Sequence, residues 1–86
     1  MTHGTDTMIQ SAQFIARSVC SKDKAIVFTG AFRPERLKDS DAAFNVGCAI
    51  GALNVLQRGV FVCMNGRVLS SERCRRDESS GKFEEM

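Results

Sequence analysis

The opening segment MTHGTDTM brings three threonine hydroxyls, one imidazole and one carboxylate together between Thr2 and Thr7. A threonine hydroxyl is a poor nucleophile until a base takes its proton, and a carboxylate can orient a cationic ligand. Polar clusters of this kind usually lie where a strand passes into a helix, because a rigid strand end can aim them at a ligand. The cluster is therefore a candidate binding site.

A purely structural role for the same residues follows from the helix that comes after them. Apolar residues recur at helical spacing over about 7–20, which predicts an amphipathic helix. Thr5, Asp6 and Thr7 are each good N-cap residues, and they lie where the helix dipole favours negative charge. A capping Asp6 needs no catalytic role, so both interpretations stay open from the residues alone.

The elements that follow alternate between strand and helix. Segments 24–30 and 59–65 are β-branched and apolar between polar ends, which predicts two buried strands. Between them, Ser40 or Asp41 begins a second predicted helix that covers about 41–57. Parallel neighbours need such a crossover helix, so the sequence predicts an α/β fold with a mainly parallel sheet.

The second helix and the segment after the second strand carry further packing signals. Ala43, Gly47 and Gly51 form a smooth stripe that is expected to let the helix lie close to a sheet. Asn65-Gly66 predicts a tight turn, after which 67–69 can pair back as a short strand. The polar tail 70–86 is expected to be irregular until Phe83, which anchors its end. The apolar face expected on the second helix is Val46, Ala49, Ile50, Leu53 and Leu56.

Composition limits the functional classes. Eighty-six residues, 43% hydrophobic and 26% charged, describe one small domain or part of a larger one. A net charge of +2 with closely alternating signs, and the absence of Trp and Tyr, argue against a nucleic-acid partner. One histidine and four cysteines without a CxxC pair give a metal site almost no support. Neither a metal nor another cofactor is expected.

The apolar segments and the cysteines predict the cellular location. The longest apolar stretch, 42–56, contains two asparagines and is too short to span a bilayer. Cys20, Cys48 and Cys63 lie inside apolar runs, as is typical of reduced and buried thiols. A charged n-region followed by an apolar h-region is absent from the start of the sequence. These features predict a cytoplasmic protein that does not associate with membranes.

Three ordered motifs resemble one enzyme family. The segments THGTDTM, IVFTGAFRPERLKDSDAAFN and GVFVCMNGRVL closely resemble the central part of the N-terminal domain of bacterial-type L-asparaginases, the asparaginase/glutaminase amidohydrolases. The closing GKFEE resembles the end of short single-domain members. The resemblance implies that 1–86 is a single partial domain of this type, a partial three-layer Rossmann/flavodoxin-like domain whose first strands are absent and which ends in the tail 70–86.

The resemblance also implies an activity and a site. The activity is hydrolysis of L-asparagine to L-aspartate and ammonia, with a small amino-acid amide as substrate. Thr5 and Asp6 correspond to the Thr and Asp of the family's Thr-Lys-Asp triad, and Asp6 also holds the substrate's α-ammonium group. Ala31 corresponds to the position whose backbone borders the substrate amide. Met1 corresponds to the end of a strand that precedes HGTDT in the family.

The sequence also departs from the family pattern. The family's second catalytic threonine lies in a Gly-Gly-Thr turn that this sequence lacks, and its lid tyrosine has no counterpart because the chain contains no Tyr. The triad lysine falls at Arg76, whose guanidinium stays protonated and cannot act as a base. Lys82 is the nearest lysine that could substitute. The sequence therefore predicts weak or absent hydrolysis by this chain alone.

The alternative to a weak hydrolase is a non-catalytic remnant or a binding module. An exposed sheet edge would let it pair with a longer relative, and assembly into a homo-oligomer is a further alternative. His3 is expected to be a hydrogen-bonding strand-end residue, and Arg33 to steady its loop through ion pairs. Arg76 is expected either to lie in a solvated stretch with Arg73 and Arg75 or to hold Asp6 electrostatically.

Overall fold

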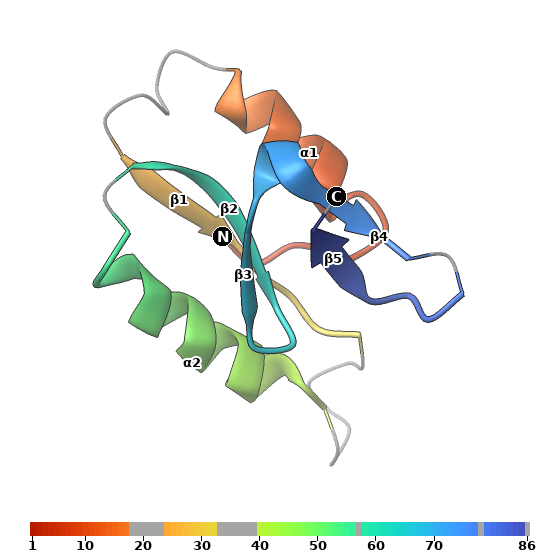
Figure 1. The fold of residues 1–86 in the computed structure, drawn as a ribbon. Helices are drawn as coiled ribbons and strands as arrows, with labels where there is room; N and C mark the ends of the chain where they lie inside the picture. The colour runs from red at the N-terminus through yellow and green to blue at the C-terminus, as the bar shows by residue number, and fades with distance from the viewer. Residues whose placement is uncertain (18–23, 33–39, 57, 78, 86) are drawn as a thin grey trace.

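The computed structural model describes residues 1–17, 24–32, 40–56, 58–77 and 79–85. Arg33 and the rest of the charged loop up to position 39 lie outside these ranges, as does Cys20. Figure 1 shows the elements in chain order. They are α1 (Met8–Ala16), β1 (Ala25–Phe28), α2 (Ala42–Leu53), β2 (Gly59–Met64), β3 (Arg67–Ser70), the 3-10 helix η2 (Ser71–Arg73), β4 (Cys74–Arg76) and β5 (Phe83–Glu85).

The main sheet has the strand order β1-β2-β3. β1 and β2 are parallel with Ala25 opposite Gly59, which confirms the α/β prediction of parallel strands joined by a crossover helix. β3 runs antiparallel to β2 because the turn between them has only two residues, Asn65 and Gly66. Their φ values of 53° and 78° are those of a tight hairpin turn, which glycine and asparagine tolerate best.

The two helices cover opposite faces of this sheet, as Figure 1 shows. Side chains alternate between the faces along each strand. Phe28 and Val62 face α1, where they pack with Met8 and Ala12. Val27 and Cys63 face α2, where they pack with Ala49. The arrangement has the three layers expected of this fold class.

Both helices are shorter than expected from the sequence. α1 ends at Ala16, and 18–20 lie outside the described residues. α2 ends at Leu53, after which the backbone N–H of Asn54 bonds to the carbonyl of Gly51 and that of Val55 to Ala52. These three-residue bonds tighten the last turn and close the helix before position 57.

The prediction of which α2 residues face the sheet is wrong in part. Ala49 is buried, but Ile50 and Leu53 are 60% and 45% exposed, while Asn45 is fully buried. Gly47 and Gly51 do not approach the sheet either, since a Cβ added at either would meet no atom within 4 Å. Relative to the prediction, α2 is rotated so that Asn45 faces the sheet, where it forms hydrogen bonds to Gly30 and Asn65. These buried bonds stabilise the fold more than burial of the Ile50 and Leu53 side chains would.

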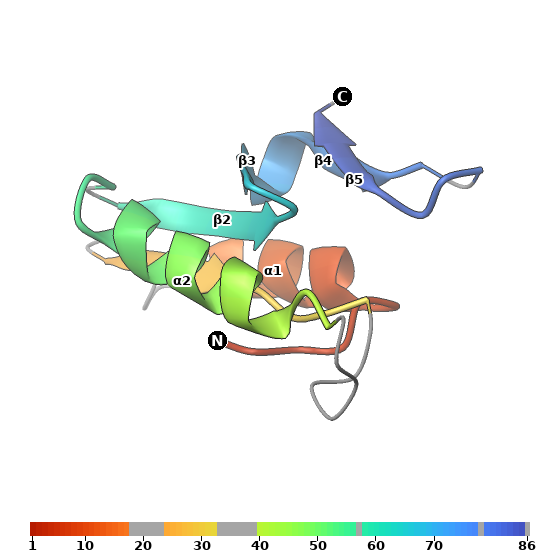
Figure 2. The same cartoon turned by 90° about the horizontal axis from the view of Figure 1, so that it is seen from below.

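The C-terminal segment is also more ordered than predicted. β4 and β5 form a second, two-stranded antiparallel sheet, with Arg76 opposite Phe83. Figure 2 shows this pair beyond β3, away from α2. Phe83 is 2% exposed, which confirms its predicted role as an anchor. The strands were missed because each has only three residues, too few for a pattern to register.

Neither α1 nor α2 combines the length and the hydropathy that crossing a bilayer requires, and this covers every helix in the described ranges. Within the same ranges, His, Cys, Asp and Glu side chains do not gather in groups of three that would suit a metal ion.

Buried thiols give the protein a pH-dependent stability above neutrality. Burial raises the pKa of Cys74 to about 11. Burial, together with the neighbouring Cys48, raises the pKa of Cys63 to about 12. Above pH 9, the ordinary value for both thiols, the unfolded chain loses protons that the folded chain keeps, so the free energy of unfolding should fall as the pH rises.

Urea denaturation at pH 7, 9 and 10.5 would measure this decline. The variant Cys74→Ala should show a smaller decline than the parent chain, which isolates the contribution of the Cys74 thiol. A free energy of unfolding that fell equally in the variant and the parent would contradict the assignment to Cys74.

Candidate functional site

The polar opening segment lies at the carboxyl end of β1. The backbone N–H of His3 donates to the Thr29 carbonyl at 2.8 Å, and that of Thr29 donates to Met1 at 2.9 Å. Thr2 and Thr29 form a parallel bridge. The segment after Thr2 therefore leaves the sheet beside Gly30, at the edge where ligands bind in parallel α/β sheets.

Gly30 is required for this close approach. A Cβ added at Gly30 would collide with the carbonyl oxygen of His3 and would touch the Met8 side chain. Ala31 follows directly and lines an open cavity of about 600 Å³ together with His3 and Gly4. The structure thus brings Ala31 next to His3 and Gly4 of the opening segment.

His3 is a hydrogen-bonding strand-end residue, as predicted. Its Nδ1 lies 2.7 Å from the Gly4 carbonyl, and its Nε2 lies 3.0 Å from the Ser11 hydroxyl. Because a carbonyl can only accept, Nδ1 donates to Gly4, and Nε2 of the neutral ring accepts from Ser11. The ring also packs edge-on against Phe28 with centroids 5.9 Å apart. Both nitrogens are therefore occupied, and His3 ties the opening segment to α1 and β1.

Asp6 does not cap α1. The N-cap residue is Thr7, and it makes no side-chain capping bond. Instead, Oδ1 of Asp6 accepts a hydrogen bond from Nη1 of Arg76 at 3.3 Å. The two residues are seventy positions apart in the chain. Of the two roles left open for Arg76, the contact with Asp6 is the one that the structure contains.

Arg76 is held in place on several sides. Its guanidinium carbon lies 5.5 Å from the ring centroid of Phe32 and 5.8 Å from that of Phe83. Its Nε donates to the Gly81 carbonyl at 3.0 Å. Cation–π contacts and a backbone bond of this kind fix the plane of the guanidinium. The Asp6 carboxylate, which is 95% exposed, therefore faces a cation of fixed position.

The turn that presents Gly81 is braced by Asp77. Oδ2 of Asp77 accepts hydrogen bonds from the hydroxyls of Ser80 and Ser79, at 2.7 and 2.9 Å. These bonds stabilise the charged carboxylate and lower the pKa of Asp77 below its ordinary value. The Gly81 backbone N–H also donates to the Asp77 carbonyl at 2.7 Å. The β4–β5 turn is thus organised locally around one carboxylate.

Thr5 is half-buried between Gly4 and Asp6. Within the described ranges, its hydroxyl has no hydrogen-bond partner. The structure therefore joins Asp6 to Arg76 and places Ala31 beside Gly4, and it leaves the Thr5 hydroxyl without a hydrogen bond to the described residues.

Comparison with known proteins identifies the family of this chain. The sequence profile described as "Asparaginase, N-terminal" matches residues 1–83. The chain belongs to this asparaginase family. Among curated relatives, L-asparaginase 2 of Escherichia coli K12 is 40% identical over 72 residues, which is 80% of this chain and 20% of that protein. One subunit of the glutamyl-tRNA(Gln) amidotransferase of Archaeoglobus fulgidus is 44% identical over 66 residues, or 77% of this chain and 16% of that protein.

Solved asparaginase structures have the same fold. A probable cytoplasmic L-asparaginase from Campylobacter jejuni superposes with a TM-score of 0.85 at 31% identity, over 98% of this chain and 27% of that one. The thermostable L-asparaginase from Thermococcus kodakarensis gives 0.89 at 24% identity, over 99% and 26%. The resemblance seen in the motifs is thus confirmed, and the chain spans about a fifth of the length of the curated asparaginase relatives it matches.

Asn45 is a site-supporting residue that the sequence analysis missed. It is fully buried, and its Nδ2 donates to the Gly30 carbonyl at 2.8 Å and to Oδ2 of Asp41 at 2.9 Å. Its Oδ1 accepts from the backbone N–H of Asn65 at 3.0 Å. An asparagine within an apolar helical pattern was the available signal. In this asparaginase-family chain, Asn45 fixes Gly30 and hence the position of Ala31.

Replacing Asn45 with alanine should lower the free energy of unfolding by about 3 kcal/mol. The substitution leaves the Gly30 carbonyl and the Asn65 N–H without their side-chain partner in a buried region. Urea denaturation of both proteins would measure the difference. Asn54→Ala, at an exposed asparagine just after α2, is the matched control and should change stability by under about 0.5 kcal/mol.

Proposed function

We propose that this chain carries part of an amide-hydrolase site and acts, weakly, on L-asparagine to release L-aspartate and ammonia. The observation that supports the proposal most directly is the position of Asp6. It lies in the segment that leaves the carboxyl end of β1 and corresponds to the family's Thr-Asp motif, and its Oδ1 lies 3.3 Å from Nη1 of the Arg76 guanidinium.

In the proposed reaction, the Thr5 hydroxyl attacks the side-chain amide carbon of the substrate. The C–N bond breaks, ammonia leaves with the proton from Thr5, and a water molecule then hydrolyses the acyl-threonine ester to give aspartate. The Asp6 carboxylate pairs with the α-ammonium group of the substrate and orients it. Ala31 borders the amide through its backbone.

Arg76 limits the rate in this proposal. A guanidinium keeps its proton, so it can steady the Asp6 charge but cannot accept the proton of Thr5. General-base assistance contributes typically 10² to 10⁴ in rate, and a site without it retains a small part of the family's activity.

NMR of ¹³C- and ¹⁵N-labelled L-asparagine with the purified 86-residue chain tests the proposal. Appearance of labelled aspartate and ammonium above the buffer rate, lost in Asp6→Asn, is the expected result. Labelled L-glutamine run in parallel assigns the preferred amide, since relatives include proteins described as glutaminase-asparaginases. A folded chain that releases no ammonium from either amide would overturn the proposal.

A second candidate function is pairing with a longer relative. Met1 and His3 form hydrogen bonds to the outer edge of β1 near its carboxyl end. Along Ala25 and Ile26, no strand of the described chain pairs with this edge. Unpaired strand edges favour strand addition from another chain. Size-exclusion chromatography with light scattering, of the chain alone and mixed with a full-length asparaginase, tests this function. A monomer that forms no mixed complex would exclude it, and a self-paired species would indicate a homo-oligomer.

We also place the chain in the cytoplasm. Cys48, Cys63 and Cys74 are free thiols, two of them buried, which suits a reducing compartment. One structural relative is described as a probable cytoplasmic L-asparaginase. Cell fractionation with an antibody against the chain would test this location.

A further inference from the structure

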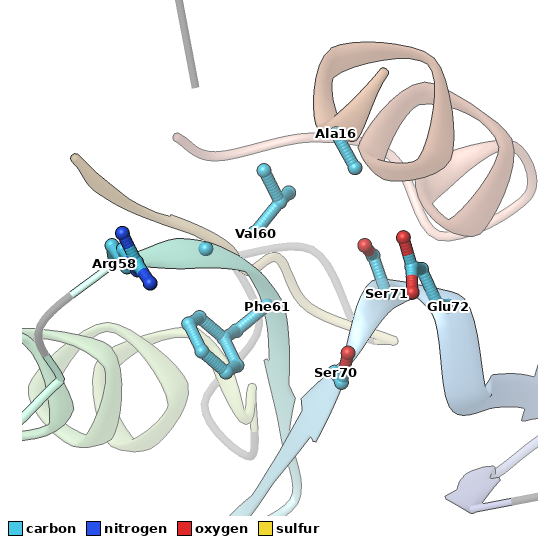
Figure 3. Close-up of a pocket in the computed structure, with 8 residues that line it drawn as sticks. Ala16, Arg58, Val60, Phe61, Ser70, Ser71 and Glu72 are labelled. Carbon is cyan, nitrogen blue, oxygen red and sulfur yellow. The ribbon is translucent and has the colours of Figure 1, made fainter. Parts of the chain in front are cut away.

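A second cavity lies at the amino end of β2, at the other end of the sheet from Asp6. It has a volume of about 370 Å³ and forms where α1, β2 and the β3–η2 junction meet. Figure 3 shows the side chains that surround it. The proposed amide-hydrolase site uses none of them.

Two side chains of opposite charge line this cavity without neutralising each other. Arg58 and Glu72 are both exposed and both contribute to its wall. Figure 3 places them on opposite sides, with Val60 and Phe61 between them. Within the described ranges, neither forms an ion pair, although the nearby Arg75 and Glu84 do so at 2.7 Å. Among the described residues, each end of the cavity therefore presents one charge without an ion-pair partner, and Arg17 shares a neighbouring hollow with Glu72.

Hydroxyl groups and apolar surface complete the walls. Ser70 and Ser71 lie beside Glu72. Val60 and Phe61, whose side chains point to opposite faces of the sheet, supply apolar surface along β2 between the two charges. Ser71 is only 1% exposed, and its carbonyl accepts a hydrogen bond from Nε2 of Gln13 at 3.1 Å, so α1 holds it in position. A concave site with apolar walls and a few fixed polar groups is the usual form of a small-molecule site.

We propose that this cavity binds a small zwitterion whose carboxylate and ammonium groups are separated by a short apolar chain. The carboxylate pairs with Arg58, and the ammonium group pairs with Glu72 and donates to the serine hydroxyls. The apolar chain lies along β2, against Val60 and the edge of Phe61. A molecule that carries a single charge satisfies one end and leaves the other charge facing apolar surface, so it binds less tightly.

The test uses ω-amino acids that differ in the distance between their carboxylate and ammonium groups. Glycine, β-alanine, γ-aminobutyrate and 6-aminohexanoate are each titrated into the ¹⁵N-labelled chain. The expected result is saturable shifts of the Phe61, Ser71 and Glu72 amide signals, with one chain length tightest. Butyrate and butylammonium, which each carry one of the two charges, should bind at least about tenfold more weakly. Equal binding by these single-charge compounds, or no saturable shift with any zwitterion, would overturn the proposal.

Variants test the two charges separately. Arg58→Gln and Glu72→Gln should each weaken the tightest zwitterion at least about tenfold, and the exchange Arg58→Glu with Glu72→Arg should restore binding in the reversed direction. Arg75→Gln, which removes an exposed charge from β4, is the matched control and should leave the affinity unchanged. Affinity that survives both single variants would place the ligand elsewhere. Circular dichroism verifies that each protein is folded.

Discussion

Thr5→Ala should lower the rate of ammonia release from L-asparagine by at least about 100-fold. In the proposed reaction, the Thr5 hydroxyl supplies the attacking oxygen, and it is free of hydrogen bonds to the described part of the chain. Removing it should leave the fold intact because Thr5 is only half-buried. A coupled assay for ammonia, with kcat and KM measured separately, should show the loss in kcat.

Two further variants sharpen this result. Thr5→Ser keeps the hydroxyl and should retain most of the rate. Thr7→Ala removes an exposed threonine two positions away that makes no side-chain capping bond to α1, so it should leave the rate unchanged. Equal losses in Thr5→Ala and Thr7→Ala would assign the effect to the conformation of the opening segment and contradict a nucleophilic Thr5.

Arg76→Lys should raise kcat for L-asparagine by about tenfold, with the gain growing as the pH rises. A lysine at this position can lose its proton and then accept one, which the guanidinium cannot do. We expect a gain below the usual range of general-base effects because the Gly-Gly-Thr turn is absent from the sequence. A pH profile of kcat from pH 6 to 10 would measure it.

The same substitution should cost stability. In the wild-type chain, Nε of Arg76 bonds to the Gly81 carbonyl while the guanidinium contacts the rings of Phe32 and Phe83. A lysine cannot make all of these contacts at once, so the free energy of unfolding should fall by about 1–2 kcal/mol. Arg75→Lys, at the neighbouring position whose ion pair with Glu84 a lysine can still make, is the control and should change neither quantity. A pH profile of kcat unchanged by Arg76→Lys would remove position 76 from the proton-transfer step.

These two predictions depend on a contact between the ends of the chain. Asp6 lies at the start of the sequence, and the guanidinium that faces it belongs to β4, which pairs with β5 near the end. The segment 70–86 is therefore part of the candidate site, because Phe83 and Gly81 fix the guanidinium that faces Asp6. Substitutions at Phe83 should change the site through Arg76, although Phe83 itself lies in the core.

Local sequence was sufficient for much of the fold. The strands β1 and β2, the crossover helix and the Asn65-Gly66 turn all follow from short-range properties, namely runs of β-branched residues, a 3.6-residue period and a dipeptide that accepts positive φ. The ordered motifs were likewise sufficient for the family, which the match over residues 1–83 confirms.

Tertiary structure alone decided which side chains meet. The rotation of α2 depends on two hydrogen bonds of Asn45 to loops far away in sequence, at Gly30 and Asn65, and no helical pattern records such partners. The choice of Asp6 between capping α1 and facing Arg76 depends on a contact across seventy positions. The pairing of β4 with β5, and the placement of Arg58 and Glu72 around one cavity, arise in the same way. Periodicity along a chain reports which face of an element is apolar, whereas long-range packing and buried polar bonds determine what that face touches.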